Sequence, residues 1–160
     1  MNSIEIVDYT PQHQPYFERL NRAWIEKYFW LEELDKYVLQ NPQEAILDEG
    51  GAILMATYNG IVAGTVALKK VNGKVYEFTK MAVDEPYRRK GIAEALSYAA
   101  FEKAKKLGAG KVILYSQTGL APAISMYKKI GFIEVPLEKD IYQRSDIKME
   151  IELQNVKVSV

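Results

Sequence analysis

The chain has 160 residues, with 21 Lys+Arg, 21 Asp+Glu and no cysteine. This length fits one domain of ordinary size, and a hydrophobic content of 48% is typical of a folded protein, not a disordered one. The lack of cysteine excludes disulfides, thiolate metal sites and a cysteine nucleophile. A formal net charge of zero argues against a dedicated nucleic-acid-binding protein.

The first half of the chain predicts a strand, two helices and then a three-stranded antiparallel meander. Alternating apolar residues indicate the first strand, and apolar residues at helical spacing indicate both helices. Asn59-Gly60 and Asn72-Gly73 are typical of two-residue hairpin turns, so they separate the strands of the meander. The predicted elements are a strand at 4–9, helices at 13–29 and 32–39, and strands at 52–58, 61–71 and 75–83.

The second half predicts alternating helices and strands. A long helix at 90–107 is amphipathic, and Gly108 suits the left-handed position after its end. The run from Val112 to Ser116 is typical of a strand buried on both faces. The remaining elements are a helix at 122–129 and an antiparallel pair at 132–135 and 147–153. We therefore predict an α+β fold in one domain over residues 1–153, in which helices flank a mixed, mostly antiparallel sheet, followed by a tail at 154–160.

The junction between the meander and the long helix combines three cations with small residues. It reads Arg88-Arg89-Lys90-Gly91-Ile92-Ala93. Unpaired N–H groups and the positive dipole end of a helix favour an anion, and the small residues let a bulky anion approach the backbone. A diphosphate is the natural ligand. The chain has neither the Gly-Lys-Ser/Thr of a Walker loop nor a three-glycine dinucleotide fingerprint at this place.

This junction resembles the Arg/Gln-x-x-Gly-x-Gly/Ala signature of the GNAT superfamily of N-acetyltransferases. The segment 123–132 is similar to the family's Ala-x-x-x-Tyr-x-x-x-Gly-Phe pattern, and the order of elements matches over nearly the whole chain. The resemblance implies a GNAT-type fold that uses acetyl-CoA as its acyl donor. The alternative is that residues 88–93 are only the charged first turn of a solvated helix.

The resemblance implies which residues hold the cofactor. The helix-start turn would bind the pyrophosphate of acetyl-CoA, and the preceding strand would pair with its pantetheine arm. Leu120 stands where family members often have an asparagine, which puts one polar contact in doubt. The implied cofactor-binding residues are Met81, Ala82, Val83, Arg88, Arg89, Lys90, Gly91, Ile92, Ala93, Leu120 and Tyr127.

The resemblance also implies direct transfer, in which a neutral amine attacks the thioester in a ternary complex. A primary amine has a pKa near ~10.4, so a base has to remove its proton at neutral pH. Tyr127 is the candidate general acid and Glu77 the candidate base, acting through water. Strand alternation places Glu77 on the face of Met81 and Val83 if no bulge intervenes. The alternatives are a tyrosine that only packs on its helix and an ordinary exposed carboxylate.

Family substrates lie against the first helices and the loop before the last strand. The candidate substrate-binding residues are Trp24, Tyr28, Glu32, Tyr142 and Arg144, and the same segments hold Lys27, Glu33 and Asp35. Acidic groups would attract a cationic amine, whereas Arg144 would hold a substrate carboxylate. The alternative is that the two aromatic residues belong to the core and that the acidic residues coat a solvated helix.

Three functions remain open at this point. The first is N-acetylation of a small-molecule or peptide α-amine; the others are a non-catalytic acyl-CoA-binding module or sensor and a protein-lysine acetyltransferase. We expect no metal, nucleic-acid or membrane partner, a cytoplasmic location and a possible homodimer. Residues 88–129 hold nine Lys+Arg against two Glu, a balance of +7 that suits a polyanionic cofactor.

Overall fold

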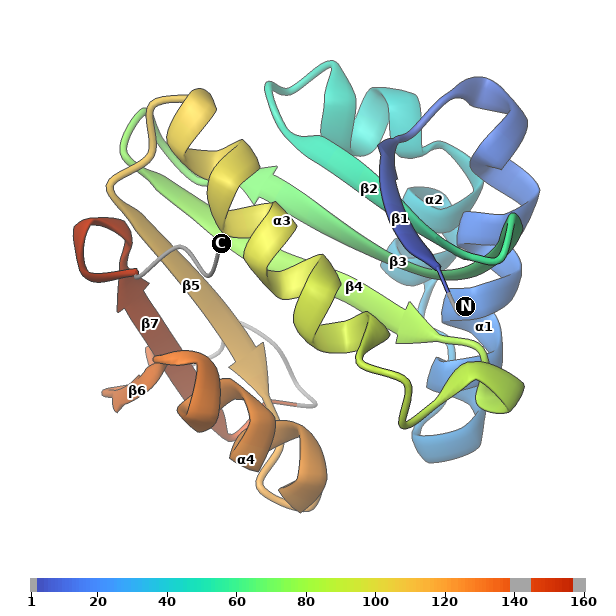
Figure 1. The fold of residues 1–160 in the computed structure, drawn as a ribbon. Helices are drawn as coiled ribbons and strands as arrows, with labels where there is room; N and C mark the ends of the chain where they lie inside the picture. Colours follow the sequence, from blue (N-terminus) through green and yellow to red (C-terminus); the bar gives the residue numbers. More distant parts are fainter. Residues whose placement is uncertain (1–2, 139–144, 157–160) are drawn as a thin grey trace.

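The computed structural model describes residues 3–138 and 145–156, which contain one seven-stranded sheet (Figure 1). Its order is β1-β2-β3-β4-β5-β7-β6. The strands are β1 (Ile4–Asp8), β2 (Ala52–Tyr58), β3 (Ile61–Lys70), β4 (Val75–Val83), β5 (Lys111–Ser116), β6 (Ile133–Val135) and β7 (Ile147–Glu152). Among these described strands only β4 and β5 pair in parallel, and a helix connects them. The prediction of a mixed, mostly antiparallel sheet is confirmed.

Two layers of helices cover the two faces of the sheet. In Figure 1, α3 (Ile92–Lys106) and α4 (Ala121–Ile130) lie on the near face, while α1 (Gln14–Tyr28) and α2 (Glu33–Gln40) lie on the far one. Each face therefore has its own apolar core. The α3/α4 core is built around Leu96, Phe101, Leu114 and Phe132, and the α1/α2 core around Phe17, Leu39, Ile53 and Met55.

The turns follow local backbone chemistry. Asn59 and Gly60 have φ angles of 50° and 85°, as the tight β2–β3 hairpin needs, and Gly108 after α3 has a φ of 93°. A π-helix at Gln43–Leu47 separates α2 from β2 and is not predicted from the sequence pattern. No described helix has the length and apolar character to cross a membrane.

Strands β4 and β5 stay paired over a short distance only. Val75, Tyr76 and Glu77 pair with Lys111, Val112 and Ile113. Beyond these pairs the strands diverge, as the arrows labelled β4 and β5 show (Figure 1). The facing edges of residues 78–83 and 114–116 therefore have no strand partner in the described structure.

A bulge interrupts β4 where it borders this gap. Thr65 on β3 pairs with Ala82, but Ala67 pairs with Thr79, so β4 carries one extra residue. Lys80 lies in the bulge and has a φ of 54°, which is left-handed backbone without a glycine. The bulge shifts the alternation of side chains along the rest of the strand.

Candidate active site

The turn between β4 and α3 presents a run of free backbone N–H groups. Arg89 and Gly91 both have left-handed φ angles, of 63° and 83°, and α3 begins directly after them. The first helical hydrogen bond runs from the N–H of Ala95 to the carbonyl of Gly91, at 3.0 Å. Within the described chain, the N–H groups of residues 89–94 have no acceptor. Six donors without an acceptor at the positive end of a helix are an arrangement that favours an anion.

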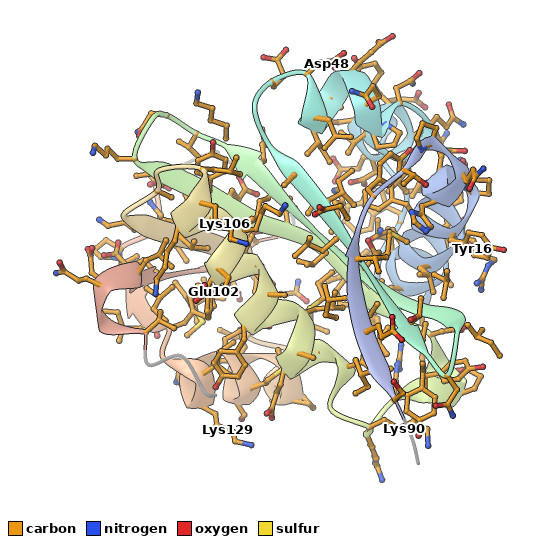
Figure 2. The ribbon with its side chains drawn as sticks, turned by 45° about the horizontal axis from the view of Figure 1, so that its top comes forward. Tyr16, Asp48, Lys90, Glu102, Lys106 and Lys129 are labelled. Atoms are coloured by element: carbon orange, nitrogen blue, oxygen red, sulfur yellow. The ribbon has the colours of Figure 1, made fainter. Side chains whose placement is uncertain are left out.

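The three cations of this turn have different surroundings. Arg88 turns back towards β4, where its Nε donates to the Val83 carbonyl at 3.4 Å. Arg89 and Lys90 are exposed, and the Lys90 ammonium lies 5.2 Å from the centre of the Tyr58 ring. Lys90 marks the opposite end of α3 from Lys106 (Figure 2). Arg89 and Lys90 are therefore the cations available to a bound phosphate.

Small residues let the start of α3 lie close to the sheet and leave the turn open. Gly64 pairs with Val83, and a Cβ atom on Gly64 would lie 3.1 Å from Ile92 and 3.3 Å from the Ala82 carbonyl. The start of α3 can thus pack directly on β3, beside the end of β4. A Cβ atom on Gly91 would meet nothing within 4 Å, so the space in front of the turn is open.

Tyr127 lies on α4, on the α3/α4 side of the sheet. Its ring packs edge-on against Phe78 and Phe132, with centroids 6.0 Å and 5.8 Å apart. Burial raises the pKa of Tyr127 to about 12. No described residue forms a hydrogen bond with its hydroxyl group. Tyr127 is therefore protonated and neutral at physiological pH. Leu120, half-buried, precedes the first turn of α4.

Glu77 occupies the last position at which β4 pairs with β5, and it faces the other side of the sheet. Its neighbour Phe78 packs in the α3/α4 core, so Glu77 points towards the α1/α2 side. Met81 and Val83, beyond the bulge, again contact the α3/α4 core. The expectation that Glu77 shares their face is therefore wrong. Glu77 is also 6% exposed, which contradicts the alternative of an exposed carboxylate.

A polar cluster lies beside Glu77 on β5 and β7. The Tyr115 hydroxyl donates to Glu138 at 3.0 Å, and Glu138 also forms an ion pair with Lys148. Burial, the bond to Glu138 and the charges of Glu138 and Glu77 raise the pKa of Tyr115 to about 12. The bond from Lys148 lowers the pKa of Glu138. Sequence reasoning missed Tyr115 because it lies inside the apolar run of a buried strand.

The candidate substrate residues on α1 form an aromatic group. The rings of Trp24 and Tyr28 lie 5.3 Å apart, and those of Trp24 and Phe29 lie 5.7 Å apart. Trp24 is half-buried against the α1/α2 core, but Tyr28 is 43% exposed, so Tyr28 is not a core residue. Lys27 forms an ion pair with Glu85, which ties the end of α1 to the anion-binding turn.

The acidic residues at the start of α2 differ in their burial and in their bonding partners. Glu32 precedes the helix, and its backbone N–H donates to the Asp35 carboxylate at 3.0 Å. Asp35 is buried and forms an ion pair with Lys80 at 3.0 Å, so it does not coat a solvated helix. Glu33 is exposed. Tyr142 and Arg144 lie outside the described residues.

Comparison with known proteins places this geometry in a family. The family model for the acetyltransferase (GNAT) family matches residues 7–132. The uncharacterized N-acetyltransferase YvbK of Bacillus subtilis is 31% identical over 69% of this chain and 73% of its own length. An N-alpha-acetyltransferase of Sulfurisphaera tokodaii is 30% identical over 82% of this chain and 72% of its own length.

Solved structures share the fold at lower identity. A GNAT-family acetyltransferase of Staphylococcus aureus superposes with a TM-score of 0.83 at 19% identity, covering 94% of this chain and 99% of the other. The paiA N-acetyltransferase of Thermoplasma acidophilum, solved in complex with coenzyme A, superposes with a TM-score of 0.72 at 22% identity and the same coverage.

Proposed function

The chain belongs to the GNAT family of acetyltransferases, and from this premise we propose that it transfers the acetyl group of acetyl-CoA to a primary amine. Acetyl-CoA is the acyl donor of this fold, and the residues present suit it. The six free N–H groups of residues 89–94 match a pyrophosphate, and Arg89 and Lys90 add positive charge. When bound, acetyl-CoA supplies the activated thioester.

The observation that carries the proposal is the unpaired edge of β4 that leads into the anion-binding turn. Residues 78–83 do not pair with β5, and β4 ends at Val83, a few residues before the free N–H groups. Met81, Ala82 and Val83 thus offer backbone groups to an extended chain that contains amides. A ligand with a diphosphate at one end and an amide-containing arm fits both features.

Glu77 and Tyr127 would move the protons of the reaction. Glu77 lies on the α1/α2 side, where it would accept the proton of the incoming amine, directly or through water. Tyr127 lies on the α3/α4 side and would donate a proton to the departing sulfur, because its raised pKa keeps it protonated. The base and the acid therefore approach the gap from opposite faces of the sheet.

The acceptor would enter on the side of α1 and α2. We infer a primary amine, either on a small molecule or as the α-amine of a peptide, and the N-alpha-acetyltransferase relative supports the peptide form. Tyr28 and Glu32 would contact it, since both lie at the junction of α1 and α2 on this side. Tyr142 and Arg144, in the segment that follows Glu138, are further proposed contacts.

An amine panel tests this function. Release of free CoA thiol is measured with acetyl-CoA and three sets of acceptors: small amines, peptides with a free α-amine, and α-blocked peptides with an internal lysine. Turnover with either of the first two sets supports the proposal. Turnover with internal lysines alone indicates a protein-lysine acetyltransferase. Tight CoA binding without any turnover contradicts the enzymatic proposal and indicates a binding module.

A further inference from the structure

A partly buried ion pair joins helix α2 to the bulge of strand β4. The Lys80 ammonium lies 3.0 Å from Oδ1 of Asp35, and the side chains are 18% and 5% exposed. The other carboxylate oxygen of Asp35 accepts the backbone N–H of Glu32 at 3.0 Å. One carboxylate thus holds the first turn of α2 and the side chain of the bulge together.

The partner of Asp35 sits at an unusual position of the backbone. Lys80 has a φ of 54°, a conformation that costs energy for any residue with a Cβ atom and that persists only where the surroundings impose it. Asn and Gly adopt this conformation readily, whereas lysine has no such preference. Its side chain is held by Asp35, which restrains this conformation together with the β3 pairs of Thr79 and Ala82.

The ion pair also has a particular place relative to the gap. Lys80 lies in the middle of residues 78–83, the part of β4 that does not pair with β5. It also lies in the bulge, where β4 has one residue more than β3. Because no strand of the described residues pairs with this edge, its backbone groups depend on other restraints for their orientation. Helix α2, on the other side of the ion pair, belongs to the acceptor side.

We propose that Asp35 is a positioning residue for acetyl transfer, which acts through Lys80 to hold the β4 bulge in register with the acceptor side. This inference rests on the proposed function. The ion pair ties the unpaired part of β4, which would bind acetyl-CoA, to α2, which would bind the amine. The two substrates would therefore keep a fixed position relative to each other. The pair also neutralises Lys80, whose unpaired charge would repel a cationic amine.

The pair can be removed in ways that separate positioning from folding. Asp35→Asn and Lys80→Asn each remove one charge of the ion pair, and both should lower the melting temperature. The double variant buries no unmatched charge and keeps a residue suited to positive φ at position 80, so its melting temperature should recover. Asp8→Asn, which removes the partner of Lys103 at 2.8 Å between β1 and α3, is the control.

Two measurements on these variants test the inference. Hydrogen exchange of the backbone should accelerate in residues 79–82 and in α2 together in all three variants, and in neither segment in the control. With the best acceptor, kcat should fall tenfold or more in the double variant as well, while the dissociation constant of CoA changes less than threefold. The control should keep its kcat.

The outcomes separate this inference from the proposed function. A double variant with recovered melting temperature and wild-type kcat overturns the positioning role and leaves a structural one. Exchange that accelerates in only one of the two segments also overturns it, because the pair then does not link them. If the unmodified chain acetylates no amine, the proposed function fails, and the exchange result still reports whether the link exists.

Discussion

The ring of Tyr127 meets the ring of Phe78 edge-on at 6.0 Å, while Glu77, the residue before Phe78, points to the opposite face of the sheet. The two candidate catalytic side chains are therefore separated by the thickness of β4. This arrangement suits a reaction in which one proton is removed and another delivered on opposite sides of the reacting carbon. It also means that the two residues can be changed independently.

Replacing Tyr127 with Phe should lower kcat about 10- to 100-fold and leave CoA binding nearly unchanged. The ring contacts with Phe78 and Phe132 remain, and only the proton donor is lost. Steady-state kinetics and a CoA titration measure both effects. Tyr98→Phe, in a half-buried tyrosine of α3, is the matched control. Full activity in Tyr127→Phe would disprove the assignment of the acid.

Replacing Glu77 with Gln should lower the rate about 100-fold, with the largest loss at low pH. At low pH more of the amine carries a proton, so the reaction depends more on a base. The pH–rate profile of the variant should therefore be steeper on its acid side. Glu5→Gln, in an exposed residue of β1, is the control. An unchanged profile would rule out Glu77 as the base.

Replacing Gly91 with Ala should weaken CoA binding several-fold and lower the free energy of unfolding by about 1 kcal/mol. A Cβ atom there meets no neighbour, so the cost comes from the φ of 83°. Gly108→Ala is a matched control. Gly108 lies at the other end of α3, has a φ of 93°, and a Cβ atom added to it would also have no atom within 4 Å. Both variants should lose stability, but only Gly91→Ala should lose affinity. If Gly91→Ala and Gly108→Ala bind CoA with equal affinity, the proposal that the turn before α3 binds the cofactor is contradicted.

The stability of the protein should fall above pH 10. Burial raises the pKa of Tyr127 to about 12, compared with about 10 in an unfolded chain. The folded state therefore holds this proton more tightly, and the resulting stabilisation is complete below pH ~10 and lost as the pH rises through ~12. Denaturant unfolding between pH 8 and 12 measures the loss. The loss should be smaller in Tyr127→Phe, and an identical loss in both proteins would contradict the raised pKa of Tyr127.

Most of the fold could be predicted from local patterns. Asn59-Gly60 gave the hairpin turn, apolar periodicity gave the helices, and the glycine after a basic run marked the start of α3. These signals depend on residues close together in the chain, so a single sequence contains them. The anion-binding turn belongs to this group, because its donors are backbone groups of consecutive residues.

The errors concern features that depend on distant contacts. The bulge at Lys80 has no glycine or asparagine to mark it, and it reversed the expected relation between Glu77, Met81 and Val83. Asp35 looked like a solvated helix residue because its partner is 45 positions away. Tyr115 was hidden in an apolar run for a similar reason: its partner Glu138 lies beyond the next helix and strand.

The short junction between β4 and β5 has a consequence for the energetics of the whole molecule. Within the described residues, three strand pairs join the β1–β4 half of the sheet to the β5–β7 half, apart from the helices that span both. An acyl-CoA molecule bound between the diverging strands would contact both halves and hold them together. Ligand at 100 times its dissociation constant adds about 2.7 kcal/mol to the stability of a folded protein. For this chain, the concentration of acyl-CoA would therefore affect the free energy of unfolding as well as the reaction rate.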